Sequence, residues 1–281
     1  MSWIIYVILF LITAVTFNQT YKVITKKMQN PGALTVLMEL LSGLVSLLMI
    51  PFFEIKLPEN PMVYVFLGLA CIFYALNDRI SIVARKGLEA STYSMIKQTS
   101  TVLMIFAGVL FFKEKFILNK IIGALLIVFS NILVFYKKGN LKSNKYALIG
   151  LLASLCNTIA LFIDVNYSKQ MNLPLYAGFT LLIPALIIIL FERISPKKII
   201  AEFNANDKKM IIISCIAQGL MMVFKLRAYQ LGQVSIVAPL CTLTIMLNVI
   251  IGYFFLKERN NLLKKIVAAT IIILGIVLIK L

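Results

Sequence analysis

Long apolar stretches restrict this chain more than any other feature of its sequence. Each comes close to the roughly 20 residues that an α-helix needs to cross the hydrocarbon layer of a membrane. Hydrophobic side chains make up 61% of the sequence and charged ones only 14%, whereas about a quarter of the residues of a soluble domain are charged. Lipid offers no partners to free backbone groups, so the sequence predicts an all-α integral membrane protein of the multi-pass type.

Ten such stretches are separated by short connections. The longest connection, 192–208, is too short to hold a further domain. We therefore expect ten transmembrane helices, near residues 3–21, 33–53, 62–85, 90–112, 117–136, 146–167, 174–191, 209–230, 234–256 and 263–280.

The sequence also repeats itself once. Ser91 and Ser235 begin two similar runs, Glu114 and Glu258 close them, and both pairs are separated by 144 residues. Five helices in each copy is an odd number, so the second copy enters the membrane from the opposite side. We expect an inverted 5+5 repeat, with residues 1–140 as the first copy and 141–281 as the second. Secondary transporters often have this architecture, with the substrate site between the repeats.

Basic residues are distributed unevenly between the connections. Those after odd-numbered helices hold 18 Lys and Arg residues, and those after even-numbered helices, together with the termini, hold 6. By the positive-inside rule the odd connections are cytoplasmic, which predicts that both termini lie outside. The membrane that we expect is the cytoplasmic membrane of a prokaryote.

Several classes of function are disfavoured by composition. The chain has no His, and its sequence contains no HExxH, CxxC or P-loop pattern, so we expect no metal, no cofactor and no enzymatic activity. Its four cysteines fall inside apolar runs, where a free thiol is the simplest interpretation. The net charge of +17 comes mostly from residues at helix ends. There they act as topology signals and contacts for lipid headgroups, so we expect no nucleic-acid partner.

A family resemblance rests on the ends of the fourth helix in each half. Both close on an aromatic-rich run that leads into Lys113-Glu114 and Lys257-Glu258, and a glycine-marked helix follows each. Pro239 lies in the ninth helix. In these features the chain resembles the drug/metabolite transporter superfamily of the EamA type. The resemblance covers nearly the whole chain and implies a ten-helix transporter.

A narrower resemblance concerns the nucleotide-sugar transporters. Their third helix carries a run similar to Tyr74-Ala75-Leu76-Asn77, and their fourth helix carries a Tyr, Gln and Lys set that is similar to Tyr93 and Lys97-Gln98. The spacing between the tyrosine and the lysine differs here, so the substrate of those proteins is not carried over.

Ionisable side chains interrupt the apolar stretches of the first half. Arg79 and Lys97 lie at similar depth on neighbouring antiparallel helices, where they could face one another; Asp78 is next to Arg79, and Glu39 lies about as deep on the second helix. A charge at that depth is costly in lipid and normally faces the interior of a bundle. Two interpretations stay open: a self-neutralised network that holds the helices together, or a net-positive pocket for an anionic substrate.

The second half offers a matching set toward the opposite side of the membrane. Gln218 and Lys225 share one face of the eighth helix, and Asp164 lies on the sixth. We expect the substrate to bind among Arg79, Lys97, Tyr93, Asn77, Tyr74, Gln98, Lys225 and Gln218. Three carboxylates are candidates for proton coupling or charge pairing, since a buried carboxylic acid can exchange a proton near neutral pH: Glu39, Asp78 and Asp164.

These observations favour a secondary active transporter, an exporter or exchanger, of a small polar metabolite that is anionic or zwitterionic and crosses by alternating access. The alternatives are a membrane enzyme or lipid-headgroup-handling protein and a non-transporting membrane scaffold. An enzyme would need clustered carboxylates, His or Ser at the membrane interface. A scaffold would leave the inward charges fully paired. The expected partners are therefore a small-molecule substrate and the lipid bilayer.

Overall fold

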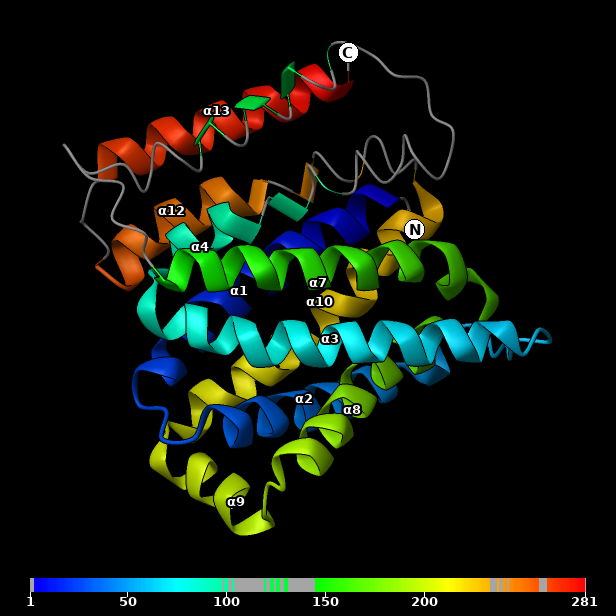
Figure 1. The fold of residues 1–281 in the computed structure, drawn as a ribbon. Helices are drawn as coiled ribbons and strands as arrows, with labels where there is room; N and C mark the ends of the chain where they lie inside the picture. The colour runs from blue at the N-terminus through cyan, green and yellow to red at the C-terminus, as the bar shows by residue number, and fades with distance from the viewer. Residues whose placement is uncertain are drawn as a thin grey trace.

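The described part of the chain is a bundle of long helices that lie side by side (Figure 1). The computed structural model describes residues 3–97, 99–100, 103, 119, 122–123, 125–126, 129–130, 145–232, 237, 240–241, 243–257 and 262–280. No strand occurs among these residues, and six of their helices are long and apolar enough to cross a membrane. The all-α membrane class is confirmed. The count of ten helices stays a prediction.

All but one of the described helices overlap expected spans, with two short 3₁₀ turns between them, and most of the expected helix 117–136 lies outside the described residues. Their bounds are α1 (Trp3–Lys26), α2 (Pro31–Leu47), η1 (Ile50–Phe52), α3 (Met62–Gly87), α4 (Ala90–Lys97), α7 (Lys145–Tyr167), η2 (Ser168–Gln170), α8 (Leu173–Glu192), α9 (Pro196–Ala205), α10 (Lys208–Leu231), α12 (Leu243–Phe255) and α13 (Leu262–Lys280). The predicted boundary between the two copies lies outside the described residues.

Local sequence sets where several helices start. The side chain of Asn30 accepts a hydrogen bond from the backbone N–H of Ala33 at 3.0 Å, and a proline follows at the start of α2. Asn172 does the same for Leu175 at the start of α8, again with a proline in the first turn. Such caps satisfy backbone donors that have no partner inside the helix. The second helix of each half thus begins with the same device.

Helices of one half pack on helices of the other, and the contacts match when the two halves are interchanged. The most extensive contacts join α1 with α10 and α3 with α7, so the first helix of each half packs on the third helix of the other. The two second helices, α2 and α8, pack on one another. In the same way α1 contacts α12 of the second half, and α7 contacts α4, the corresponding helix of the first half. A two-fold relation between the halves would produce this pattern.

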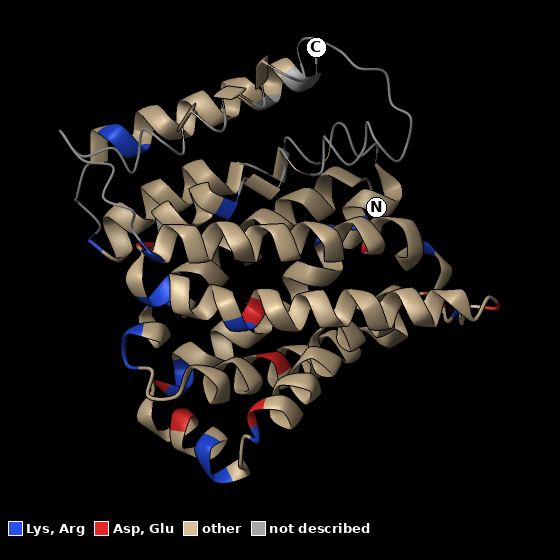
Figure 2. Cartoon of the chain, in the orientation of Figure 1, with Lys and Arg blue, Asp and Glu red and all other residues tan. Residues whose placement is uncertain are grey.

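The first helices of the two halves run in opposite directions. α1 ends beside the end of α3, where Lys22 donates to the carbonyl of Arg85, whereas α7 begins there, with Tyr146 against Gly87. We call this the α9 end of the bundle, because the connection that contains α9 lies there too. Lys and Arg residues gather at this end (Figure 2).

Helix α9 was not predicted, since the sequence indicated only that the connection 192–208 is too short for a further domain. Its proline start and its apolar Ile199 and Phe203 pack it onto the bundle, where both residues join the apolar core beneath. The buried carboxylate of Glu202 accepts hydrogen bonds from the backbone N–H groups of Gln29 and Asn30. A carboxylate is favourable there, because it faces the positive end of the α2 dipole.

Glycine allows α2 to lie close to α10. A Cβ added at Gly219 would come within 2.5 Å of the backbone oxygen of Ser42, and the hydroxyl of Ser46 donates to the carbonyl of Gly219 at 3.1 Å. Small residues let helix backbones approach in this way in membranes, where packing rather than the hydrophobic effect drives association.

This contact gives a test of the fold. Gly219→Val should push α2 and α10 apart and destabilise the protein by about 1–3 kcal/mol, as over-packing does in closely packed cores. Thermal unfolding of the purified protein in detergent measures the effect. Gly68→Val is the matched control, because a Cβ at Gly68 meets nothing within 4 Å. Equal melting temperatures for the two variants would contradict the close α2–α10 contact.

Candidate functional site

Asp164 is completely buried and joins the two halves. It lies on α7, and its two carboxylate oxygens accept hydrogen bonds from the hydroxyl of Tyr74 on α3 and, at 2.8 Å, from that of Tyr176 on α8. A buried carboxylate is costly unless it is hydrogen-bonded or paired with a cation. The ammonium group of Lys225 on α10 also attracts it. Side chains of three helices, α3, α7 and α8, therefore meet at this one carboxylate.

Glu39 forms a second polar contact between the halves. The side-chain amide N–H of Gln218 on α10 donates to Glu39 Oε1 at 2.8 Å. The amide oxygen of Gln218 accepts a hydrogen bond from the hydroxyl of Ser42 at 3.1 Å. The second oxygen of Glu39, Oε2, is buried and has no hydrogen-bond partner among the described residues. The prediction placed Gln218 among substrate ligands, whereas here its hydrogen bonds go to α2.

Lys97 lies at the centre of the charged groups. Its ammonium group is half-buried and donates to the amide oxygen of Asn157 at 3.4 Å. It attracts the carboxylates of Asp78 and Glu39 and repels Lys225 on α10. Charged side chains of α2, α3, α4, α7 and α10 thus act on one another electrostatically inside the bundle, and we call them the connected set.

Arg85 completes this set near the α9 end. An exposed charge is usual near the end of a helix, but Arg85 is buried with 5% of its surface exposed. Its guanidinium group lies over the ring of Tyr93 at 4.2 Å, and over those of Phe17 and Tyr21 at 5.1 Å each. Aromatic faces attract a cation, most strongly where water is excluded.

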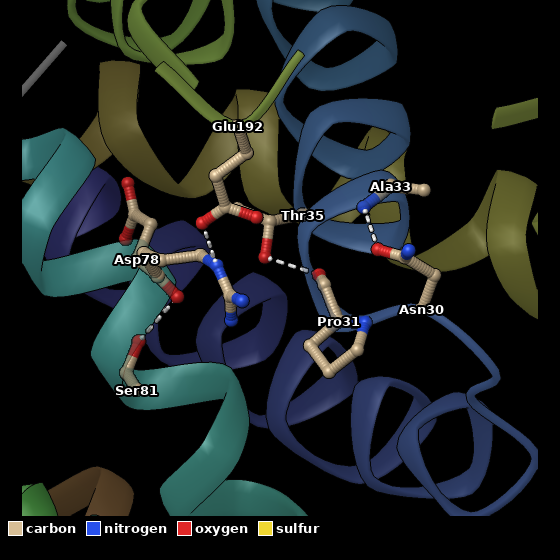
Figure 3. A network of polar contacts seen from close by, with 8 residues as sticks. Asn30, Pro31, Ala33, Thr35, Asp78, Ser81 and Glu192 are labelled. Atoms are coloured by element: carbon tan, nitrogen blue, oxygen red, sulfur yellow. Dashed lines mark hydrogen bonds and ion pairs between the residues drawn. The ribbon is translucent and has the colours of Figure 1, made fainter. Parts of the chain in front are cut away.

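Arg79, which could have faced Lys97, makes its ion pair elsewhere. It pairs instead with Glu192 at the end of α8. Figure 3 shows Glu192 reaching between α2 and α3, beside Asp78. The reason is geometric: successive residues of a helix point about 100° apart, so Asp78 and Arg79 cannot both point at the same neighbour. Asp78 is attracted electrostatically by Lys97, and its carboxylate accepts a hydrogen bond from Asn77.

The other predicted residues differ in how far they are buried and in their hydrogen-bond partners. Asn77 is buried, and its amide donates to Asp78 at 2.6 Å. Tyr93 is also buried, with a hydroxyl that has no partner among the described residues. Lys225 is half-buried and makes no hydrogen bond or ion pair within the described ranges. Gln98 lies outside the residues that the structure describes.

Sequence reasoning missed three contributors: Arg85, Tyr176 and Glu192. Arg85 stands beside Lys86 near a helix end, where an exposed charge is the usual interpretation. The spacing of Phe17 and Tyr21, four residues apart on one helix face, was the only local signal for an aromatic partner. Nothing in the local sequence connects Tyr176 with Asp164.

Comparison with known proteins agrees with this arrangement. The EamA-like transporter family matches the chain twice, over residues 3–136 and again over residues 144–281. Its members are transporters rather than enzymes. No curated protein sequence matches the chain.

Solved structures share the fold. One, described simply as "Crystal structure of protein", aligns with a TM-score of 0.64 over 96% of this chain and 94% of its own length. The two sequences are 15% identical, so the likeness concerns the fold alone.

The tyrosines around Asp164 provide a test of the site. Tyr176→Phe removes one of the two donors to a buried carboxylate and should destabilise the protein by about 1–3 kcal/mol. Tyr64→Phe is the matched control, because Tyr64 lies on α3 with 47% of its surface exposed. Thermal unfolding of both variants compares them. A Tyr176→Phe protein as stable as the control would rule out this hydrogen bond.

Proposed function

The chain belongs to the EamA-like transporter family, and from this premise we propose that it is a secondary active transporter, an exporter or exchanger, of a small polar metabolite. The metabolite is anionic or zwitterionic and crosses by alternating access between the inverted halves. The observation that carries this proposal is the connected set of charged side chains, to which both halves contribute. Ionisable groups inside a membrane bundle commonly mark the path of a solute.

Contacts between the halves at both ends support an alternating mechanism. At the α9 end Arg79 pairs with Glu192, and Glu202 caps the start of α2. At the opposite end the side chain of Asn172 donates to the carbonyls of Phe53 and Glu54. Alternating access would break one group of contacts while the other holds, with the central charges between them.

Three carboxylates are placed to carry a coupling proton: Glu39, Asp78 and Asp164. Asp164 has both oxygens occupied by tyrosine hydroxyls, whereas Glu39 keeps one buried oxygen that has no partner in the part of the chain that the structure describes. Of these two, Glu39 is the better proton carrier, because a proton can bind its free oxygen without displacing a donor. A downhill gradient or exchange would need none of the three. The location in a prokaryotic cytoplasmic membrane stays a prediction.

A scaffold role is less well supported. It would leave the interior charges fully paired, but Lys97 forms no ion pair with a carboxylate in the described ranges and its hydrogen bond goes to an amide.

Transport by purified protein in liposomes tests the proposal. With a panel of small anionic and zwitterionic metabolites we expect uptake or exchange of at least one class. Lys97→Gln should reduce that flux on the order of tenfold or more, because it removes a charge-assisted contact in the centre of the bundle. Lys198→Gln is the matched control, since Lys198 is exposed on α9.

Two outcomes would contradict the proposal. The first is the absence of flux for every member of the panel with folded protein in the membrane. The second is equal flux for the Lys97→Gln and Lys198→Gln proteins, which would remove Lys97 from the substrate site.

A further inference from the structure

A groove lies between α1 and α10 on the outside of the bundle. Its volume is about 210 Å³, and six side chains line it: Thr13, Thr16, Ile213, Ile216, Ala217 and Leu220. Ile213 and Ile216 keep 43% and 44% of their surface exposed, so the groove is open on its outer side. Both helices are long and apolar enough to cross a membrane. The groove therefore opens toward the hydrocarbon of the bilayer.

The lining of this groove suits hydrocarbon. The hydroxyls of Thr13 and Thr16 donate to the carbonyls of Leu9 and Ile12 at 2.8 and 2.9 Å, so their hydrogen bonds are made inside α1. What the two threonines present beside the isoleucines is mostly methyl groups. An apolar cavity of about 150 Å³ can hold a benzene molecule, so this groove has room for a segment of an acyl chain.

The two walls of the groove run in opposite directions. α1 ends at the α9 end of the bundle, and α10 begins there, directly after α9. Phe17 and Ile24 of α1 share one apolar core with Ile211 and Ala217 of α10. Residues near the end of α1 therefore lie at the level of residues near the start of α10.

A lysine follows each wall of the groove at the α9 end. Lys209 lies seven residues before Ile216, and Lys27 lies eleven after Thr16, spacings that keep each lysine on the same helix face as its wall. At 1.5 Å per residue these separations are about 10 and 16 Å along the helix axes. Both lysines are exposed. A headgroup beside them would leave its acyl chain at the depth of the groove.

Carboxylates near the two lysines are engaged elsewhere. Asp207 accepts hydrogen bonds from the backbone N–H groups at the start of α10, and Glu202 accepts from those at the start of α2. Within the described ranges neither Lys27 nor Lys209 forms an ion pair. Their positive charges are available to an anion outside the protein.

We propose that this groove binds one anionic phospholipid of the leaflet at the α9 end. An acyl chain occupies the groove, and the phosphate group lies between Lys27 and Lys209. The charge selects the lipid: acyl chains pack on apolar helices whatever headgroup they carry, whereas lysines near the membrane surface attract anionic headgroups. Since α1 belongs to the first half and α10 to the second, the lipid connects the halves. The site does not depend on the transport function proposed above.

Photo-crosslinking in liposomes tests the choice of headgroup in the unaltered protein. A small fraction of phosphatidylglycerol or phosphatidylcholine, each with a diazirine in one acyl chain, is added to unlabelled phosphatidylcholine. Mass spectrometry of peptides measures the label in the groove relative to that around Leu69, which is 41% exposed on α3. We expect this ratio to be on the order of tenfold higher with phosphatidylglycerol, because two lysines favour the anionic headgroup.

Two pairs of substitutions separate a site from general attraction by a basic surface. Lys27→Gln combined with Lys209→Gln should remove most of the preference for phosphatidylglycerol. Lys197→Gln combined with Lys198→Gln is the matched control, because it removes the same charge from exposed positions on α9 at the same end. The control pair should keep the preference.

A further variant tests the place of the acyl chain. Thr16→Phe fills the groove and should lower its label severalfold. Ile8→Phe is the matched control, since Ile8 is 50% exposed on α1 and does not line the groove. Size-exclusion chromatography shows that each variant is folded, and the comparison of the two lipids needs no variant.

Four outcomes would overturn the proposal. Equal labelling of the groove by the two lipids would remove the role of the headgroup, and a stronger preference elsewhere would move the site. Equal loss of preference in the two lysine pairs would reduce the effect to attraction by the whole basic end. Unchanged label in the Thr16→Phe protein would exclude an acyl chain from the groove. The transport assay is independent of all four.

Discussion

The cost of placing a charge in hydrocarbon governs the arrangement of this bundle. Lipid cannot solvate an ammonium or carboxylate group, so each one in a membrane-spanning helix must turn toward other helices, toward water or toward the helix end. The interior charges of α2, α3, α4, α7 and α10 all turn toward other helices. Because the groups lie on both halves, the requirement to satisfy them also holds the halves together. The buried carboxylate of Asp164, with one tyrosine from each half, is the clearest case.

The same interactions connect stability with function. A bundle that paired every charge directly would be stable and closed. Here the ammonium group of Lys97 donates to the neutral amide of Asn157 and makes no ion pair with a carboxylate among the described residues. The fixed contacts, such as Glu202 at the start of α2 and Gly219 against Ser42, lie in the periphery or at helix crossings. Rigid crossings around an incompletely paired centre suit a protein that must bind a solute and then rearrange.

Much of the fold could be predicted from the sequence, because membrane spans follow from length and apolarity alone. The start of α2 after Asn30 follows from its capping side chain and proline. The contacts of the site were harder to predict, since they depend on tertiary geometry. Helical spacing indicates that Asp78 and Arg79 point in different directions but not which of them points inward. Arg85 looks like an exposed helix-end charge until three aromatic rings from α1 and α4 surround it.

The central claim is that Lys97 and Lys225 face a wet interior between the halves. Cysteine accessibility in a background without the four native cysteines tests it directly. Lys97→Cys and Lys225→Cys should react with a charged, membrane-impermeant thiol reagent, and Leu69→Cys, at a position 41% exposed on the outside of α3, should not. If the first two react only with a reagent dissolved in lipid, as Leu69→Cys would, the account is contradicted.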